Sequence, residues 1–182
     1  KEIEDVVREL ERKVRENKRR NDEVIKRLER LVEKNTELVR RLIRTLEKLV
    51  EDLEDIVRRI KDKDELEERL ERIRRRIKEL VRKLEELNKK SLDDIRRLVE
   101  KLERENERSL REIKRDVDEL VRSEEAKKVA EDVERRIRRS VEEARRLLEE
   151  VKRKMEESVE ESKRLLKKVE DEAKDVVDRA RK

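Results

Sequence analysis

The chain has 182 residues, 61% of them Asp, Glu, Lys or Arg, and its formal net charge is +5. It contains no Gly, Pro, Cys, His, Phe, Tyr or Trp. These absences exclude a disulfide framework and the usual Gly and Pro turns, and few strand-forming residues remain, so the composition predicts an all-α protein. No apolar run approaches the length of a membrane span, and no segment resembles a signal peptide. We therefore expect a soluble chain, and the sequence assigns it no cellular location.

A first long helix is predicted over residues 2–61. Its apolar residues recur at steps of three and four, which places them in one stripe along a helix. High charge density alone would also be compatible with disorder, but disordered chains carry no such stripe. The stripe contains Ile3, Val7, Leu10, Val14, Val24, Leu28, Leu31, Leu38, Leu42, Leu46, Leu49, Leu53, Ile56 and Ile60.

A second helix is predicted over residues 64–122, after a break in the rhythm at Lys61 to Asp64. We expect Asp64 to cap this helix and Glu67, three residues later, to complete a capping box. Its stripe contains Leu66, Leu70, Ile73, Ile77, Leu80, Leu84, Leu87, Ile95, Leu98, Leu102, Ile113, Val117 and Leu120.

A third helix is predicted over residues 124–181, with Ser123 as its cap and with Glu124 and Glu125 near the positive end of the helix dipole. Its apolar residues continue the same rhythm from Ala126 to Ala180. Connections of only a few residues place consecutive helices antiparallel and side by side. The predicted fold is therefore a single domain, residues 1–182, forming an antiparallel up-down-up three-helix bundle.

The helices carry an internal repeat of eighteen residues. The third helix divides into three similar blocks that begin at Glu124, Glu142 and Glu160. Eighteen residues complete five turns at 3.6 residues per turn, the natural period of a straight helix, whereas a strict heptad repeat would impose a left-handed supercoil. We therefore expect long, nearly straight helices.

Polar residues interrupt the apolar stripes at the spacing of this repeat. If the turns centre near residues 63 and 123, antiparallel pairing sets residue i of the first helix level with about residue 126 − i, and residue j of the second level with about residue 246 − j. These levels predict two buried polar layers that fix the register of the helices. One layer contains Asn35, Asn88, Ser91 and Ser158, and the other contains Asn17, Asn106, Ser109 and Ser140.

The alternative is that these polar side chains lie at the edge of the stripes and contact water. Asn35 and Asn88 fall near the middle of their apolar arcs, which favours burial. Asn21, Thr45 and Ser162 fit neither layer. Ser162 shares its helical phase with Ala126, Ala144 and Ala180, and we interpret this line of small residues as a place where helices approach closely.

Taken together, the Glu/Lys/Arg surface, the Ile/Leu/Val core, the eighteen-residue blocks and the Asn and Ser layers resemble a computationally designed helical bundle with buried hydrogen-bond networks. The resemblance covers the whole chain. It implies a structural scaffold with no natural biochemical function, no cofactor and no required partner. A second interpretation remains open, because stripes of roughly 120 to 140° also suit three members of a four-helix bundle. The chain would then be a binding module that self-associates or pairs with a designed helix.

Other functional classes lack their usual residues. Without His, Cys, Tyr or a Gly-rich loop, no recognised catalytic or metal-binding constellation is present, so no enzyme activity and no metal are predicted. Basic and acidic residues are interleaved and no aromatic side chain can stack on bases, which predicts no specific nucleic-acid binding. The stripes lack Trp and Phe and are used in packing, so no membrane association is expected.

Overall fold

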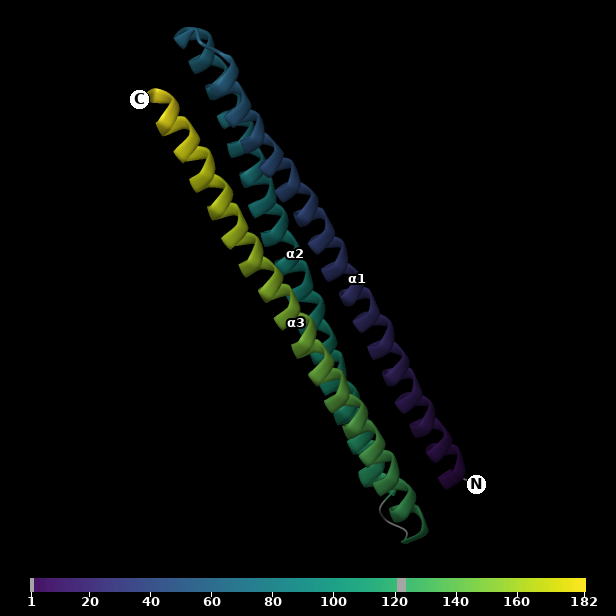
Figure 1. Cartoon of the computed structure of the whole chain (residues 1–182). Coiled ribbons are helices and arrows are strands. Elements are labelled where there is room, and N and C mark those ends of the chain that lie inside the picture. Colours follow the sequence, from purple (N-terminus) through teal and green to yellow (C-terminus); the bar gives the residue numbers. More distant parts are fainter. Residues whose placement is uncertain (1, 121–123) are drawn as a thin grey trace. The chain divides into compact units, whose positions relative to one another are not determined.

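The structure, a computed structural model, describes residues 2–120 and 124–182. Three α-helices account for nearly all of them: α1 (Glu2–Arg59), α2 (Lys63–Leu120) and α3 (Glu124–Arg181) (Figure 1). No strand occurs in the described ranges, and none of these helices carries an apolar stretch that could traverse a lipid bilayer. The predicted all-α fold with three helices is confirmed.

The connection between α1 and α2 corrects the predicted helix ends. Helix α1 ends at Arg59 instead of residue 61, and α2 begins at Lys63 instead of residue 64. Asp62 is the capping residue, because its Oδ1 accepts the N–H of Asp64 at 3.1 Å and its carbonyl accepts the N–H of Leu66 at 2.9 Å. The predicted cap Asp64 is therefore wrong, since this residue already lies in the first helical turn, where it donates to the cap.

The predicted partner of that cap, Glu67, instead bonds Arg181 of α3. The predicted cap Ser123 and the predicted end of the second helix at residue 122 lie outside the described residues.

The chain forms two compact units, each built from segments of all three helices. Unit 1 contains Lys1–Leu31 and Asp94–Arg153, and unit 2 contains Val32–Asp93 and Lys154–Lys182. On each of the three helices, the boundary between the units falls inside the helix. That the whole chain behaves as a single domain stays a prediction.

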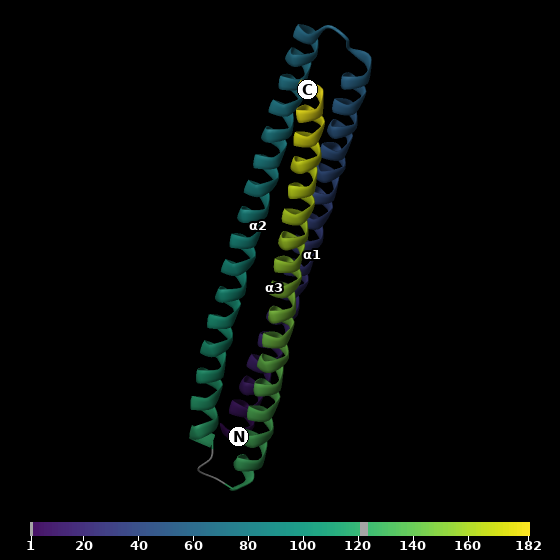
Figure 2. The same ribbon diagram turned by 60° about the vertical axis from the view of Figure 1, so that its left-hand side comes forward.

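Contacts within each unit show how its helical segments run. In unit 1, Lys13 bonds Asp116 and Asn17 bonds Asn106, so the numbers on α2 fall as those on α1 rise. In unit 2, Asn88 bonds Ser162 and Glu67 bonds Arg181, so α2 and α3 are also antiparallel there (Figure 2). The pairings are those that the predicted up-down-up order requires, for α1 with α2 in unit 1 and for α2 with α3 in unit 2.

Each unit encloses its own apolar core, made partly from the predicted stripes. The stripes omit the buried residues Val39, Ile43, Val50 and Val81, and they include Ile3 and Leu38, which the structure leaves exposed. Complete burial of one Leu, Ile or Val side chain contributes about 1.5–3 kcal/mol, so these cores are the main source of stability. The core of unit 2 contains Val39, Ile43, Leu46, Val50, Leu53, Leu70, Ile77, Leu80, Val81, Leu84, Leu166, Val169, Ala173 and Val176. The core of unit 1 contains Leu10, Ile113, Val117, Leu120, Ala126, Ala130, Val133, Ile137 and Val141.

Candidate functional site: buried polar networks

Unit 2 contains a chain of hydrogen bonds that joins all three helices, which we call the unit-2 network. Ser91 Oγ of α2 donates to Asn35 Oδ1 of α1 at 2.9 Å, and Asn35 Nδ2 donates to Asn88 Oδ1 of α2 at 3.1 Å. Asn88 Nδ2 then donates to Ser162 Oγ of α3 at 2.8 Å. Asn35, Asn88 and Ser162 are all buried.

The unit-2 network ends on the backbone. Ser162 Oγ donates to the carbonyl of Val159 at 2.8 Å, so each hydroxyl and amide in the chain has a role as donor or acceptor. Among the described residues, the buried side-chain polar atoms that lack a partner all belong to unit 1. A buried polar atom without any partner costs about 1–3 kcal/mol. Each side-chain N and O atom of this network that is buried has at least one partner, which makes the network compatible with an apolar core.

Ser158, predicted for the same layer, takes a different partner. Its Oγ lies 3.2 Å from Thr36 Oγ1, which itself donates to the carbonyl of Val32 at 2.8 Å. A hydroxyl has one hydrogen, so Ser158 is the donor to Thr36. The residue of α3 that contacts Asn88 is Ser162, one turn beyond Ser158. The position of α3 along α2 therefore differs by four residues from the position estimated by centring the turn near residue 123.

A second, shorter chain of hydrogen bonds lies in unit 1, and we call it the unit-1 network. Asn21 Nδ2 donates to Asn17 Oδ1 at 3.0 Å, and Asn17 Nδ2 donates to Asn106 Oδ1 at 3.0 Å. All three side chains are buried, with exposed fractions of 1–2%. The network joins α1 to α2 and includes no side chain of α3.

Both ends of the unit-1 network are open. Asn21 Oδ1 and Asn106 Nδ2 are buried and have no hydrogen-bond partner. The eighteen-residue repeat explains the second of these. Asn106 corresponds to Asn88, whose Nδ2 donates to Ser162, but the residue eighteen positions before Ser162 is the buried Ala144, which has no hydroxyl.

The remaining residues predicted for the second layer lie apart from this chain. Ser109 Oγ accepts a hydrogen bond from Arg20 Nη2 at 3.0 Å, and Arg20 Nε lies 3.3 Å from a carboxylate oxygen of Glu105. That Nε is buried and its N–H is not directed at the oxygen, so the contact is an ion pair without a hydrogen bond. Ser140 is half-buried, and within the described part of the chain its hydroxyl makes no hydrogen bond. In the repeat, Ser140 corresponds to Ser158, whose partner on α1 is Thr36. The residue that corresponds to Thr36 is Lys18.

Three residues of these clusters are missed or misread by the sequence pattern. The pattern assigns Asn21 and Ser162 to neither layer, yet both are hydrogen-bonded members of a network, so that prediction is wrong. Each follows a predicted layer residue by four positions, Asn21 after Asn17 and Ser162 after Ser158, and this helical spacing is the signal that could have identified them. Thr36 is not singled out by the pattern, although it directly follows Asn35. Thr45, also predicted to lie outside the layers, is exposed and bonds the carbonyl of Arg41.

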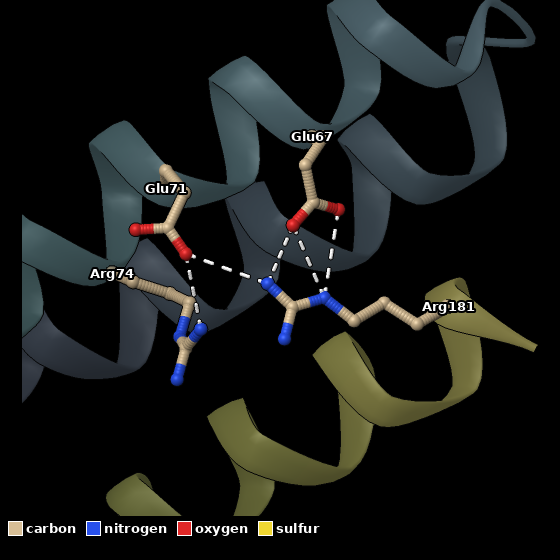
Figure 3. Close-up of polar contacts among 4 residues, drawn as sticks. All are labelled: Glu67, Glu71, Arg74 and Arg181. Carbon is tan, nitrogen blue, oxygen red and sulfur yellow. Dashed lines mark hydrogen bonds and ion pairs between the residues drawn. The ribbon is translucent and has the colours of Figure 1, made fainter.

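Ion pairs on the surface connect helices within each unit. In unit 2, Arg181 of α3 reaches Glu67 and Glu71 of α2, and Glu71 also bonds Arg74 (Figure 3). The hydrogen bond to Glu67 raises the pKa of Arg181 further above its ordinary value. In unit 1, the hydrogen bond from Lys13 Nζ to Asp116 Oδ2, 2.9 Å long, raises the pKa of Lys13.

Near the amino-terminal end of α1, in unit 1, the hydrogen bond that Arg12 donates to Glu9 lowers the pKa of Glu9. Because all these side chains contact water, such pairs contribute little to stability compared with the cores.

The chemistry of the two networks is that of neutral amides and hydroxyls. Neither network contains an ionisable side chain within its chain of bonds, so a change of pH over the ordinary range leaves their hydrogen bonding unaltered. No group of three or more acidic side chains among the described residues is arranged to hold a metal ion. The arrangement can fix the relative positions of helices, which requires directional bonds and no reactive group.

No protein-family model matches the chain, and comparison with curated proteins finds no match. Among solved structures, the chain is similar to one described as a computationally designed three helix bundle. The sequence identity is 16% and the TM-score is 0.49, over 98% of this chain and 86% of that chain.

Proposed function

We propose that the chain is a structural scaffold in which the apolar cores supply stability and the buried polar networks specify register. The unit-2 network is the observation that supports this proposal most directly. Asn35, Asn88, Ser91 and Ser162 come from three helices and satisfy one another at 2.8–3.1 Å inside an apolar core. Apolar stripes with a regular repeat are compatible with several registers, whereas directional bonds between particular residues are compatible with one.

The composition supports the further proposal that the scaffold is designed and has no natural substrate. Gly and Pro normally make up about 7% and 5% of a protein, and this chain of 182 residues contains neither. Helices of idealised sequence joined by short connections are typical of designed proteins, because regular backbone geometry is the simplest to specify. The amide and hydroxyl chemistry of the networks gives no reason to propose an enzyme.

The register proposal can be tested by replacing the unit-2 network with apolar residues. The variant combines Asn35→Leu, Asn88→Leu, Ser91→Ala and Ser162→Ala. Spin labels at two exposed positions, Glu33→Cys on α1 and Lys90→Cys on α2, report the distance between these helices by electron paramagnetic resonance. We expect one narrow distance distribution in the parent chain and a broad or divided one in the variant.

A control variant, Thr45→Val, changes a polar residue of the same helix outside the network and should leave the distribution narrow. A distribution that is equally narrow in the four-residue variant would mean that the apolar core alone sets the register, and the proposal would be wrong.

A second candidate function is association with another helix or with a second copy of the chain. It is favoured by large apolar side chains that remain exposed in unit 1, namely Ile3, Val6 and Val129, at 42%, 38% and 37%. Single exposed apolar residues are common on protein surfaces, so this observation carries less weight than the network. Sedimentation at several concentrations distinguishes the two, because a scaffold that needs no partner keeps the mass of one chain throughout.

A further inference from the structure

A groove of about 520 Å³ lies between α2 and α3 of unit 2. Its floor is apolar and consists of Ile77 and Val81 from α2 and Ala173 and Val177 from α3. Charged side chains of both helices form its rims. A volume of this size is within the range of sites that accept small organic molecules, roughly 300–1,000 Å³.

The repeat provides an internal comparison for the floor of the groove. Two repeats away on each helix, in unit 1, Lys114 corresponds to Lys78 and Ile137 corresponds to Ala173. The hollow between α2 and α3 at that position has a volume of only about 190 Å³. One repeat away on α3, the corresponding residue is Met155. Ala173 thus stands where both other repeats carry a large side chain, and its small size opens the groove.

The charges along the groove differ between its two rims. The α2 rim carries three basic residues at successive turns, Arg74, Lys78 and Arg82, whereas the α3 rim alternates through Glu170, Lys174 and Asp178. Arg74 is engaged by Glu71 at 3.2 Å (Figure 3).

Within the described part of the chain, neither Lys78 nor Arg82 forms an ion pair. Glu85 lies at the end of the same rim. The α2 side of the groove therefore presents unneutralised positive charge beside an apolar floor.

We propose that this groove binds a small amphiphile with an apolar body and one anionic group, such as an aryl sulfonate or a medium-chain carboxylate. The apolar body lies on Ala173 and its neighbours, and the anionic group lies beside Lys78 and Arg82. On the opposite rim, Lys174 lies between Glu170 and Asp178, so the α3 side carries a net negative charge and favours an orientation with the anionic group on the α2 side. This site is independent of the proposed scaffold function, since neither polar network contributes a residue to it.

The test measures binding of 1-anilinonaphthalene-8-sulfonate to the folded full chain by fluorescence. We expect saturable binding of one probe per chain, weakened by salt and displaced by octanoate but not by octylammonium. Ala173→Ile introduces the residue found at the equivalent position 137 and should weaken binding at least about tenfold, since it fills the floor. Ala173→Met, which copies the equivalent Met155, is a second filling variant in case the branched side chain disturbs packing.

Charge variants separate the rim from the floor. Lys78→Gln with Arg82→Gln should weaken probe binding about three- to tenfold. The matched control, Lys167→Gln with Lys168→Gln, removes two exposed cations of the same unit away from the groove and should change binding less than twofold.

Three results would overturn the proposal. The first is probe binding that neither Ala173 variant weakens. The second is displacement of the probe by octylammonium as effective as that by octanoate. The third is probe binding that disappears as the chain associates into dimers.

Discussion

Asn88 of α2 donates its side-chain N–H to the hydroxyl of Ser162 on α3 at 2.8 Å. Eighteen residues away on each helix, the corresponding pair is Asn106 and Ala144, and the corresponding N–H has no partner. One hydroxyl group therefore separates a network that joins three helices from one that joins two.

Ala144→Ser should stabilise unit 1. The new hydroxyl would lie at the position equivalent to Ser162 and accept the unpaired N–H of Asn106, which relieves part of the cost of burying it. A satisfied hydrogen bond of this kind contributes about 1 kcal/mol, and we expect an increase of that order in the free energy of unfolding. Chemical denaturation of parent and variant measures it.

The matched control repeats the substitution in an Asn106→Leu background. There the serine has no amide to accept from, so Ala144→Ser should give no gain or a small loss. An equal effect in both backgrounds would show that the hydroxyl acts through another group, such as a carbonyl of its own helix.

Asn35→Leu should destabilise the chain by about 1–3 kcal/mol, because it removes the acceptor of Ser91 and the donor to Asn88 within a buried site. A double-mutant cycle between Asn35 and Asn88 measures their interaction directly, and we expect a coupling energy of about 0.5–3 kcal/mol. Replacing the four residues of the unit-2 network together with apolar residues should recover the loss, since no polar group is then left without a partner. Coupling near zero would contradict a shared network.

Asp62→Ala should cost about 0.5–2 kcal/mol, because Asp62 caps the first turn of α2. Asp64→Ala is the natural comparison, since Asp64 is also acidic, lies two residues later and only donates to the cap. Its loss should stay below about 0.5 kcal/mol, the size of an exposed charge near a helix dipole. Thermal or chemical unfolding of the two variants distinguishes them, and the reverse order would restore Asp64 as the capping residue.

Lys13 should contribute a pH-dependent part of the stability. Its pKa in the folded chain is raised above the ordinary value of 10.5 by Asp116, so the folded state holds this proton more tightly than the unfolded state. The stabilisation is complete below pH 10.5 and is lost as the pH rises through the raised pKa. The difference in unfolding free energy between the parent and Lys13→Gln should therefore be constant from about pH 7 to 10 and decrease above that. A difference that grows with pH would contradict the assignment.

Any binding of duplex DNA should be weak, independent of base sequence and abolished between about 50 and 200 mM salt. The reason is that 58 basic residues are interleaved with 53 acidic ones, and no aromatic residue is present to stack on bases. Fluorescence anisotropy with two duplexes of unrelated sequence checks this expectation. Tight binding that persists at 200 mM salt would require a nucleic-acid site that the proposed scaffold lacks.

Sequence pattern predicts the helices well because burial requires apolar residues at every third or fourth position. Residues such as Leu28, Leu46 and Leu84 lie in the predicted stripes and are completely buried. The capping residue of α2 is less predictable, since Asp62 and Asp64 are chemically the same and only the backbone path selects between them.

The polar clusters depend on a different kind of information. The sequence sets Asn35 level with Ser91 and near Asn88, and the structure joins Asn35 to both. It sets Asn17 level with Ser109, whereas Asn17 bonds Asn106, three residues earlier on α2. The position of α3 depends on the geometry of its connection, which residue types alone do not determine. An error of one turn exchanges Ser158 for Ser162, because both positions face the interior of the unit. That these contacts determine the register stays a prediction.

The hydrogen bonds of the unit-2 network all run in one direction, from Ser91 to the carbonyl of Val159. Rotating the amide of Asn88 alone by half a turn would set two N–H groups against each other, and rotating Asn35 alone would oppose two oxygens. Only a concerted reversal of both amides preserves the central bond. That reversal would also require Ser162 to release Val159 in order to donate to Asn88. The two asparagines therefore behave as one cooperative element with a single preferred orientation, and their side-chain N–H groups should exchange with solvent together.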